Sequence, residues 1–350
     1  MTTSDSLQSR YPDMPRVLVA YGFPRWKKPV VRQCVAPRRV IFMAAGEAVP
    51  EGSWVVVWGM NPEPGGAGRV LRLEDGFLRS VGLGADIIRP LSWVMDGEGL
   101  YYDATRPSEL ETLLATKRFS ADECIRAAAL RQRIVDLGLT KYNLGGEEWV
   151  RPAGYQRVIL VPGQVESDAS LAYGSAEIKT NLALLQGVRA ENPEAFVVYK
   201  PHPDVVARMR LSGQDEARCR EWCDAVVTTE ALPSLLEAVD EVHVLSSLAG
   251  FEALLRGKTV VCYGQPFYAG WGLTRDIHPV MRRQRRLSLE ELVVGALLCY
   301  PLYLSRDGQR RLTPEEALDA LVDWRARKGG REPWWWECYR TVVRIFAGVR

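Results

Sequence analysis

Short apolar runs, each bounded by glycine or proline, recur through the first part of the chain. Runs of this length and flanking predict buried strands, and longer segments with an apolar stripe at helical spacing predict helices. The predicted strands are 16–21, 40–43, 54–58 and 69–73, then 91–95 and 100–102 as a hairpin, and the predicted helices are 107–114 and 121–137.

The same alternation resumes after residue 156. The predicted strands are 157–161, 196–199, 225–228, 241–245 and 260–263, and the predicted helices are 176–190, 206–224, 232–239 and 251–256. Strands that alternate with helices indicate parallel sheets covered by helices on both faces. The chain is therefore predicted to be an α/β protein.

Glycine and proline interrupt the pattern at 141–154, where we place a domain boundary near residue 150. The predicted domains are 1–150 and 151–286, followed by a C-terminal helical tail at 287–350. Within this tail, residues 287–300 form an amphipathic pattern. Thr313, Pro314 and Glu316 have the spacing of a capping box that opens a second helix.

The amino-acid composition argues against a nucleic-acid-binding, a secreted or a membrane-spanning protein. The chain has 350 residues, of which 47% are hydrophobic, and its 45 basic and 43 acidic residues nearly balance. This balance argues against a nucleic-acid partner. The N-terminus lacks the apolar core of a signal peptide, and no apolar run is long enough to span a membrane. The scattered cysteines suit reduced thiols in the cytoplasm.

Two predicted strand ends carry groups that suit a phosphate. Ser246, Ser247 and Gly250 follow the strand at 241–245 and open a helix, where free N–H groups and the helix dipole favour an anion. Lys200 and His202, in the run Tyr199-Lys-Pro-His-Pro, follow an earlier strand. Together they predict one nucleotide site along a sheet edge, whereas each alone also fits an ordinary strand–helix turn.

The C-terminal segment 333–346 combines a Trp-Trp-Trp run with flanking arginines. Such a segment suits the interface of an anionic membrane. The alternative, that this tail packs on the first domain, stays equally open. The arginine run at 282–286 is predicted to be a solvated face.

Six motifs, in order, resemble one family. They are LEDGFLRSVGLG (73–84), YYDATRPS (101–108), PGQVESDAS (162–170), KPHPD (200–204), SSLAGFE (246–252) and GQPFYAGWGLT (264–274). Together they resemble the bacterial capsule polysaccharide β-Kdo glycosyltransferases of the KpsC/LipA type. Members commonly carry two such modules, whereas this chain carries one.

The resemblance implies a GT-B-like fold, with two Rossmann-like domains that face each other across a cleft. It implies transfer, with retention, of the acidic sugar Kdo from CMP-Kdo to an oligo-Kdo glycolipid on the cytoplasmic face of the inner membrane. It implies no cofactor and no metal, and a second Kdo transferase as a potential partner.

Retention is most simply achieved by two displacements through a covalent intermediate on a carboxylate. The family's catalytic aspartate matches Asp168, which is predicted to be the nucleophile, with a helix N-cap as the alternative role. Glu74, with Asp75 close behind, is predicted to be the base that accepts the proton of the incoming hydroxyl.

The remaining predicted residues bind the donor or the sugar. Arg72 or Arg79 would hold the Kdo carboxylate, or else pair with the neighbouring acids. Tyr268 and Trp271 would wall the sugar pocket, with simple packing as the alternative. The predicted donor-binding residues are His202, Lys200, Ser246, Ser247, Gly250, Glu252, which would hold the ribose, and Gln164.

Two other functions stay open at this point. One is a GT-B enzyme for another nucleotide sugar, and the other is a non-catalytic protein of capsule assembly that binds the glycolipid.

Overall fold

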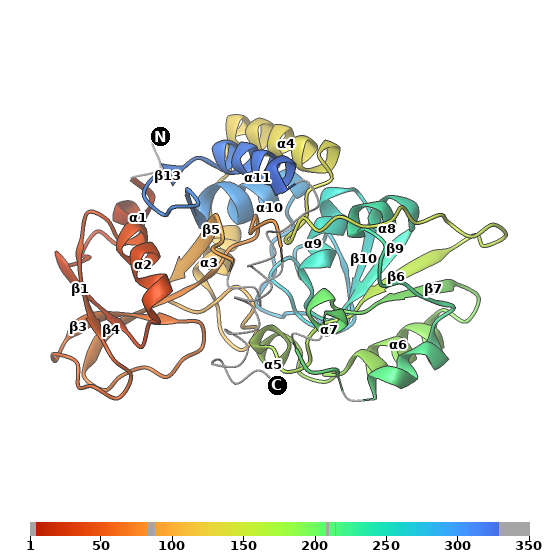
Figure 1. The fold of residues 1–350 in the computed structure, drawn as a ribbon, viewed down its shortest axis with the longest axis horizontal. Coiled ribbons are helices and arrows are strands. Elements are labelled where there is room, and N and C mark those ends of the chain that lie inside the picture. The colour runs from red at the N-terminus through yellow and green to blue at the C-terminus, as the bar shows by residue number, and fades with distance from the viewer. Residues whose placement is uncertain (1–4, 83–87, 208–209, 214, 329–350) are drawn as a thin grey trace. The chain divides into compact units, whose positions relative to one another are not determined.

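A computed structural model describes residues 5–82, 88–207, 210–213 and 215–328 of the chain. The chain divides into two compact units (Figure 1). Unit 1 comprises residues 1–79, 89–132 and 287–320, and unit 2 comprises 80–88, 133–286 and the residues from 321 onward. Helices α4 (Ala121–Asp136) and α11 (Pro314–Lys328) both contain a point of division.

Unit 1 is built on a mixed sheet of order β13-β12-β5-β4-β3-β1-β2. Strands β4, β3, β1 and β2 run parallel, whereas β5 pairs antiparallel with β4 and with β12, and β13 pairs antiparallel with β12. Its elements are α1 (Asp5–Arg10), β1 (Val17–Tyr21), η1 (Arg25–Lys27), α2 (Lys28–Cys34), β2 (Arg39–Met43), β3 (Ser53–Trp58), β4 (Ala67–Asp75), β5 (Ser92–Asp96), α3 (Glu109–Thr116), α4, α10 (Leu289–Val293), η4 (Val294–Cys299), β12 (Pro301–Leu304), β13 (Arg311–Leu312) and α11.

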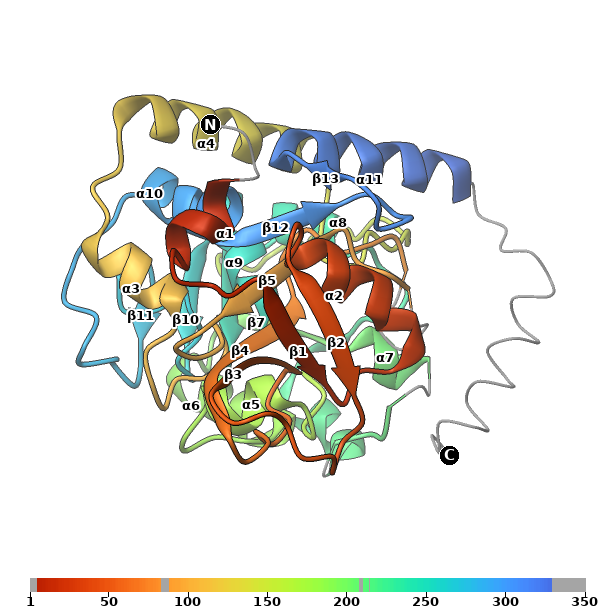
Figure 2. The same cartoon turned by 90° about the vertical axis from the view of Figure 1, so that its left-hand side faces the viewer.

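The core of unit 1 forms because apolar side chains alternate along the strands. Leu18, Leu71 and Trp93 point to one face, where they pack with Val30 and Val31 of α2. Figure 2 shows α2 beside β1 and β2. A smaller cluster that includes Val19, Val55 and Val57 lies on the other face.

Unit 2 has a sheet of order β11-β10-β9-β6-β7-β8 whose neighbouring strands all run parallel. Helices α5 and α6 and segment η3 contribute to a core with one face of this sheet, and α9 packs against β9 and β10. Its elements are β6 (Val158–Pro162), α5 (Ala169–Gly174), α6 (Asn181–Glu191), β7 (Phe196–Lys200), α7 (Pro203–Val206), η3 (Glu216–Trp222), β8 (Ala225–Val226), α8 (Leu232–Ala238), β9 (Glu241–Val244), α9 (Leu248–Leu255), β10 (Thr259–Cys262) and β11 (Arg275–Asp276).

Three expectations from the sequence need correction. Residues 100–102 form a turn, so the predicted hairpin is wrong, and β5 pairs with β4 and β12 instead. The predicted helix at 206–224 is replaced by α7 and by the 3-10 helix η3. Residues 287–320 are not a separate helical tail, because β12 is fully buried and extends the sheet of unit 1.

The predicted capping box at Thr313 is confirmed. The Thr313 hydroxyl accepts a hydrogen bond from the Glu316 amide at 3.1 Å, and the Glu316 carboxylate accepts one from the Thr313 amide at 2.7 Å. The Trp/Arg segment 333–346 lies outside the described residues, so its contact with a membrane stays a prediction.

Candidate active site

Parallel strands bring several predicted residues to one edge of unit 2. Strand β6 lies between β9 and β7, so the carboxyl ends of these three strands are neighbours. Asp168 follows β6, His202 follows β7, and Ser246 follows β9. In open α/β sheets this edge is where ligands bind.

Asp168 occupies the N-cap position of α5, but its side chain makes no capping hydrogen bond. The carboxylate is 43% exposed, and its Oδ1 lies 3.7 Å from a guanidinium nitrogen of Arg210. Because the carboxylate is half-exposed and caps no amide, a ligand can reach it from solvent. The position therefore fits the N-cap expectation for the backbone and leaves the carboxylate available for chemistry.

His202 is held as a neutral ring. Its Nδ1 accepts a hydrogen bond from the Asp204 amide at 3.1 Å, so the ring proton belongs on Nε2. Burial, aided by the nearby cations Lys141 and Arg210, lowers the pKa of His202 to about 3. The Nε2–H group therefore stays a hydrogen-bond donor at neutral pH, as a phosphate ligand requires.

Gln164 joins the ends of β6 and β9. Its Oε1 accepts from the Ser246 amide at 2.9 Å, and its Nε2 donates to the Ser246 hydroxyl at 3.2 Å. The Ser246 hydroxyl donates in turn to the Ser170 carbonyl at 2.8 Å, which ties this serine to the helix that Asp168 precedes. Both side chains thus fix the loops around the site.

Ser247 caps α9, because its hydroxyl accepts a hydrogen bond from the Ala249 amide at 3.3 Å. Gly250 leaves room for the Tyr268 hydroxyl, since a Cβ built there would lie 2.2 Å from that oxygen. The Tyr268 hydroxyl donates to the Ser247 carbonyl. Gly250 is therefore needed for packing beneath the start of α9.

Tyr268 and Trp271 are fully buried, and the Trp271 indole donates to the Phe267 carbonyl at 2.8 Å. Rings in the core cannot touch a sugar, so the structure does not support the predicted pocket wall. Packing, the alternative raised from the sequence, describes both residues.

Two other donor-site candidates also have internal partners. Glu252 is buried and accepts a hydrogen bond from the Lys141 amide at 2.6 Å, and burial raises its pKa to about 7. Lys200 donates to the Glu230 carbonyl at 2.7 Å, and burial lowers its pKa. Both side chains therefore stabilise loops through these hydrogen bonds, and their contact with a nucleotide stays a prediction.

In unit 1, Glu74 and Asp75 end β4 as predicted. Glu74 accepts hydrogen bonds from the Tyr102 hydroxyl at 3.2 Å and from the Asp75 amide at 2.8 Å. Asp75 pairs with Arg79 at 2.6 Å, which is the alternative foreseen for that arginine. The two neighbouring carboxylates therefore have different partners, a tyrosine hydroxyl for Glu74 and an arginine for Asp75.

Arg72 is held by groups other than these acids. Its guanidinium donates to the Gly59 carbonyl at 2.8 Å, to the Asn61 carbonyl at 3.2 Å and to Glu63 at 2.5 Å. It therefore fixes the loop after β3, and the predicted role in binding the Kdo carboxylate has no support from these contacts.

Three cations beside the predicted groups escaped the sequence analysis: Lys141 and Arg210 in unit 2, and Lys27 in unit 1. Lys27 is buried, and burial lowers its pKa to about 7 against the attraction of Asp75 and Glu74. Lys27 follows the end of the first predicted strand, and this position in the sequence could have marked it as a candidate ligand-binding residue. The sequence around Arg210 gives no such signal, because Arg210 and Asp168 are far apart in the chain and become neighbours only in the folded structure.

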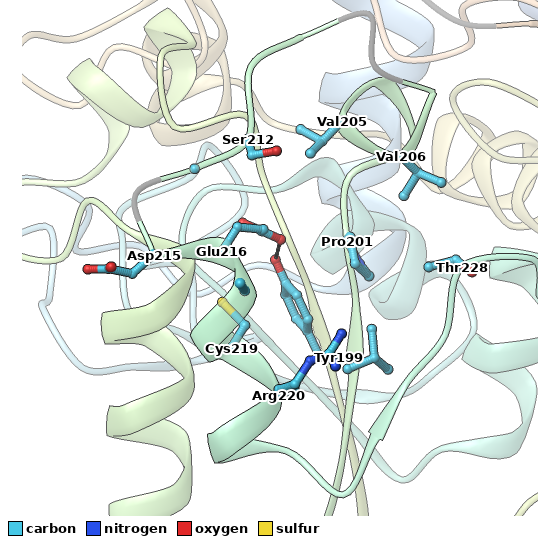
Figure 3. A pocket seen from close by; sticks show the side chains of 13 residues that line it. Tyr199, Pro201, Val205, Val206, Ser212, Asp215, Glu216, Cys219, Arg220 and Thr228 are labelled. Carbon is cyan, nitrogen blue, oxygen red and sulfur yellow. Dashed lines mark hydrogen bonds between the residues drawn. The ribbon is translucent and has the colours of Figure 1, made fainter.

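Unit 2 also contains a pocket of about 480 Å³ beside β7, α7 and η3 (Figure 3). The Tyr199 hydroxyl, which donates to Glu216, lies among its side chains. Of the described residues that line it, none is a predicted donor-binding residue. The pocket is therefore distinct from the His202 and Ser246 groups.

The sequence and structure of this chain are similar to those of known proteins, and the similarity identifies its family. A family profile described as "Capsule polysaccharide biosynthesis protein" matches residues 67–144 and 127–305, which is more than half of the chain. The chain belongs to this family. The resemblance to the KpsC/LipA type, first noted from the six motifs, is confirmed by its relatives.

Two relatives of this capsule family align with most of this chain. The capsule polysaccharide modification protein LipA of Neisseria meningitidis is 45% identical over 256 residues, which are 72% of this chain and 36% of LipA. The lipopolysaccharide-processing protein LpsZ of Rhizobium meliloti is 37% identical over 312 residues, which are 82% of this chain and 70% of LpsZ. The chain thus spans about a third of the length of LipA.

Two solved structures share the fold of this capsule family member. The β-Kdo 2,7 transferase of Thermosulfurimonas dismutans KpsC is 38% identical with a TM-score of 0.71, and the β-Kdo 2,4 transferase of the same protein is 33% identical with a TM-score of 0.74. Each match covers 87% of this chain and 98% of the solved chain. The mixed α/β fold with two sheets is therefore confirmed.

Within the described residues, no helix combines the length and the apolar character that crossing a membrane requires.

Proposed function

We propose that this chain is a retaining β-Kdo glycosyltransferase that moves Kdo from CMP-Kdo to a Kdo-terminated glycolipid during capsule biosynthesis. The observation that carries the proposal is the edge of unit 2 where Asp168, His202 and Ser246 follow three neighbouring strands. The two KpsC transferases, each matched over nearly its whole length, support the same reaction class.

In the proposed first step, the phosphate of CMP-Kdo accepts a hydrogen bond from Nε2–H of His202. Lys141 and Arg210, the cations that depress the pKa of His202, favour a phosphate at this place. The carboxylate of Asp168 attacks the anomeric carbon, the bond from that carbon to the phosphate oxygen breaks, and CMP leaves with the electron pair.

In the proposed second step, an acceptor hydroxyl attacks the same carbon and displaces Asp168, so that two inversions give net retention. Glu74 accepts the hydroxyl proton. This step requires Glu74 of unit 1 and Asp168 of unit 2 to reach one sugar, as they would in a GT-B arrangement of the two units. No cofactor other than the donor takes part.

The test supplies the purified chain with CMP-Kdo and a synthetic Kdo-terminated acceptor. We expect a product heavier by one Kdo, with a β linkage that NMR identifies. Intact mass of the Glu74→Gln variant, mixed with the donor alone, is expected to show one Kdo added to the protein, and peptide mapping should place it on Asp168.

Other outcomes separate the competing functions. Transfer from a different nucleotide sugar would replace CMP-Kdo as the donor. Binding of the acceptor without transfer from any donor would make the chain a non-catalytic glycolipid-binding protein. An α-linked product would refute retention.

A further inference from the structure

Lys27 lies at the edge of unit 1 where three parallel strands end. It closes η1, which follows β1, while Trp58 ends β3 and Glu74 lies near the end of β4. Strands β1, β3 and β4 are neighbours in the sheet, so their carboxyl ends form one edge. This edge of unit 1 corresponds to the ligand-binding edge of parallel sheets in general.

The cationic side chains at this edge differ in their hydrogen-bond and ion-pair partners. Arg72 is bound by two carbonyls and by Glu63, and Arg79 is bound by Asp75. Lys27 is only 7% exposed, and within the described residues no oxygen lies at hydrogen-bond or ion-pair distance from its ammonium group. Its Nζ lies over the ring of Trp58 instead.

A mostly buried ammonium group without an oxygen partner is costly, because burial removes most of its water and no oxygen of the described residues replaces the lost hydrogen bonds. The charges that act on it are Asp75 and Glu74, which attract it, and Arg79, which repels it. Glu74 is engaged by the Tyr102 hydroxyl, and Asp75 by Arg79. An oxygen ligand that carries negative charge would therefore complete the surroundings of Lys27.

We propose that Lys27 binds the carboxylate of the terminal sugar acid of the acceptor. This inference rests on the proposed function and names the part of the acceptor that unit 1 recognises. It reassigns to Lys27 the carboxylate-binding role that the sequence suggested for Arg72 or Arg79. A carboxylate with a single charge suits this place better than a phosphate, because Glu74 and Asp75 would repel a second negative charge.

The same placement explains how the acceptor would be oriented. With its carboxylate on Lys27, the sugar acid is anchored beside Glu74, the proposed base for its hydroxyl. Binding of the carboxylate also keeps Lys27 protonated, so acceptor affinity should fall as the pH rises through the range in which the free lysine loses its proton.

The test compares two acceptors with four proteins. The acceptors are a synthetic Kdo-terminated acceptor and the same molecule with its terminal carboxyl converted to the amide. The proteins are the wild type, Lys27→Met, Lys27→Arg and the control Lys28→Met, which alters a half-buried neighbouring lysine that packs on Phe42. Steady-state kinetics give KM and kcat, and NMR titration gives acceptor binding without turnover.

We expect Lys27→Met to raise KM for the acid acceptor by about 10- to 100-fold, the range expected for a hydrogen bond to a charged group, with little change in kcat. Lys27→Arg should recover part of the loss, and Lys28→Met should resemble the wild type. For the amide acceptor, the wild type and Lys27→Met should have the same KM.

An equal loss of affinity for both acceptors in Lys27→Met would overturn the assignment. Should that variant not fold, the wild type decides alone: KM for the acid acceptor should rise between pH 6 and 9 relative to KM for the amide. If the wild type transfers no Kdo, the proposed function is wrong. The NMR titration of acceptor binding still shows in that case whether Lys27 binds the carboxylate.

Discussion

The carboxyl-end edges of the two sheets hold their charged groups in different ways. In unit 1, Asp75 is ion-paired with Arg79, and Glu74 accepts a hydrogen bond from a tyrosine. In unit 2, the Asp204 amide fixes His202 and the Gln164 side chain fixes Ser246. The Asp168 carboxylate has one exposed arginine at 3.7 Å. Unit 2 therefore presents open hydrogen-bonding groups, whereas unit 1 presents acids whose partners are largely in place.

This difference suits two tasks. A phosphate of a leaving nucleotide needs preorganised donors, and rigid loops provide them without reorganisation. A base that accepts a proton needs a defined environment, which the tyrosine contact and the neighbouring ion pair supply.

The largest effect is expected from Asp168→Asn. Loss of the proposed nucleophile should reduce transfer by about a thousand-fold or more, because the covalent step becomes impossible. Product mass from CMP-Kdo measures it. Asp215→Asn, an exposed acid of the same unit, serves as the control and should retain wild-type activity. Full activity of Asp168→Asn would end the nucleophile assignment.

Replacing His202 tests the preorganised donor. His202→Ala should lower kcat by about 10²- to 10³-fold through loss of the Nε2–H group. His202→Asn keeps an oxygen that can cap the Asp204 amide, so it should melt at the wild-type temperature but be equally inactive. Since the pKa of His202 is about 3, its titration should leave no trace in rate profiles between pH 5 and 8. An active His202→Asn variant would contradict a role for the ring.

In unit 1, Glu74→Gln removes the proposed base and should reduce kcat by about a hundred-fold, less than the loss of the nucleophile. Glu63→Gln is the matched control, because it removes a half-exposed partner of Arg72 from the same unit. We expect it to remain within a few-fold of the wild type. Comparable losses in both variants would show that the charge of unit 1, and not Glu74 itself, is required.

Glu252 links pH to stability in unit 2. Its folded-state pKa of about 7 exceeds the unfolded value, so the folded protein binds the extra proton and stability falls as the pH rises from about 4 to 7. Glu252→Gln retains an oxygen for the Lys141 amide and loses the charge. At pH 8 it should be more stable than the wild type by about 3 kcal/mol, as thermal melts across pH would measure. Parallel pH curves for the two proteins would refute the buried, protonated carboxyl.

The smallest effect comes from two glycines in helices of unit 2. Gly250→Ala would place its Cβ against the Tyr268 hydroxyl and should destabilise the protein by about 1–3 kcal/mol. Gly187→Ala, in α6, meets the Tyr263 ring at 3.4 Å and should be neutral or stabilising by less than about 1 kcal/mol. Denaturant titration compares them. Equal effects would show that the start of α9 tolerates the extra methyl group.

The alternation of strands and helices was predictable because it depends on residues that are near one another in the sequence. The strands of unit 2, the capping box at Thr313 and the placement of Asp168, His202 and Ser246 after successive strands all follow from local pattern. Where a segment is short and apolar, as in β12, the same local pattern does not distinguish a strand from a continuing helix, so residues 287–320 were misassigned.

The sequence alone therefore determined the α/β plan, the family and the candidate chemistry at the strand ends. Tertiary structure decided which groups are occupied: it paired Arg79 with Asp75, buried Tyr268 and Trp271, and left Lys27 without an oxygen partner among the described residues. The physical reason is that burial and ion pairing depend on side chains distant in the sequence, whose proximity is fixed only when the sheets form.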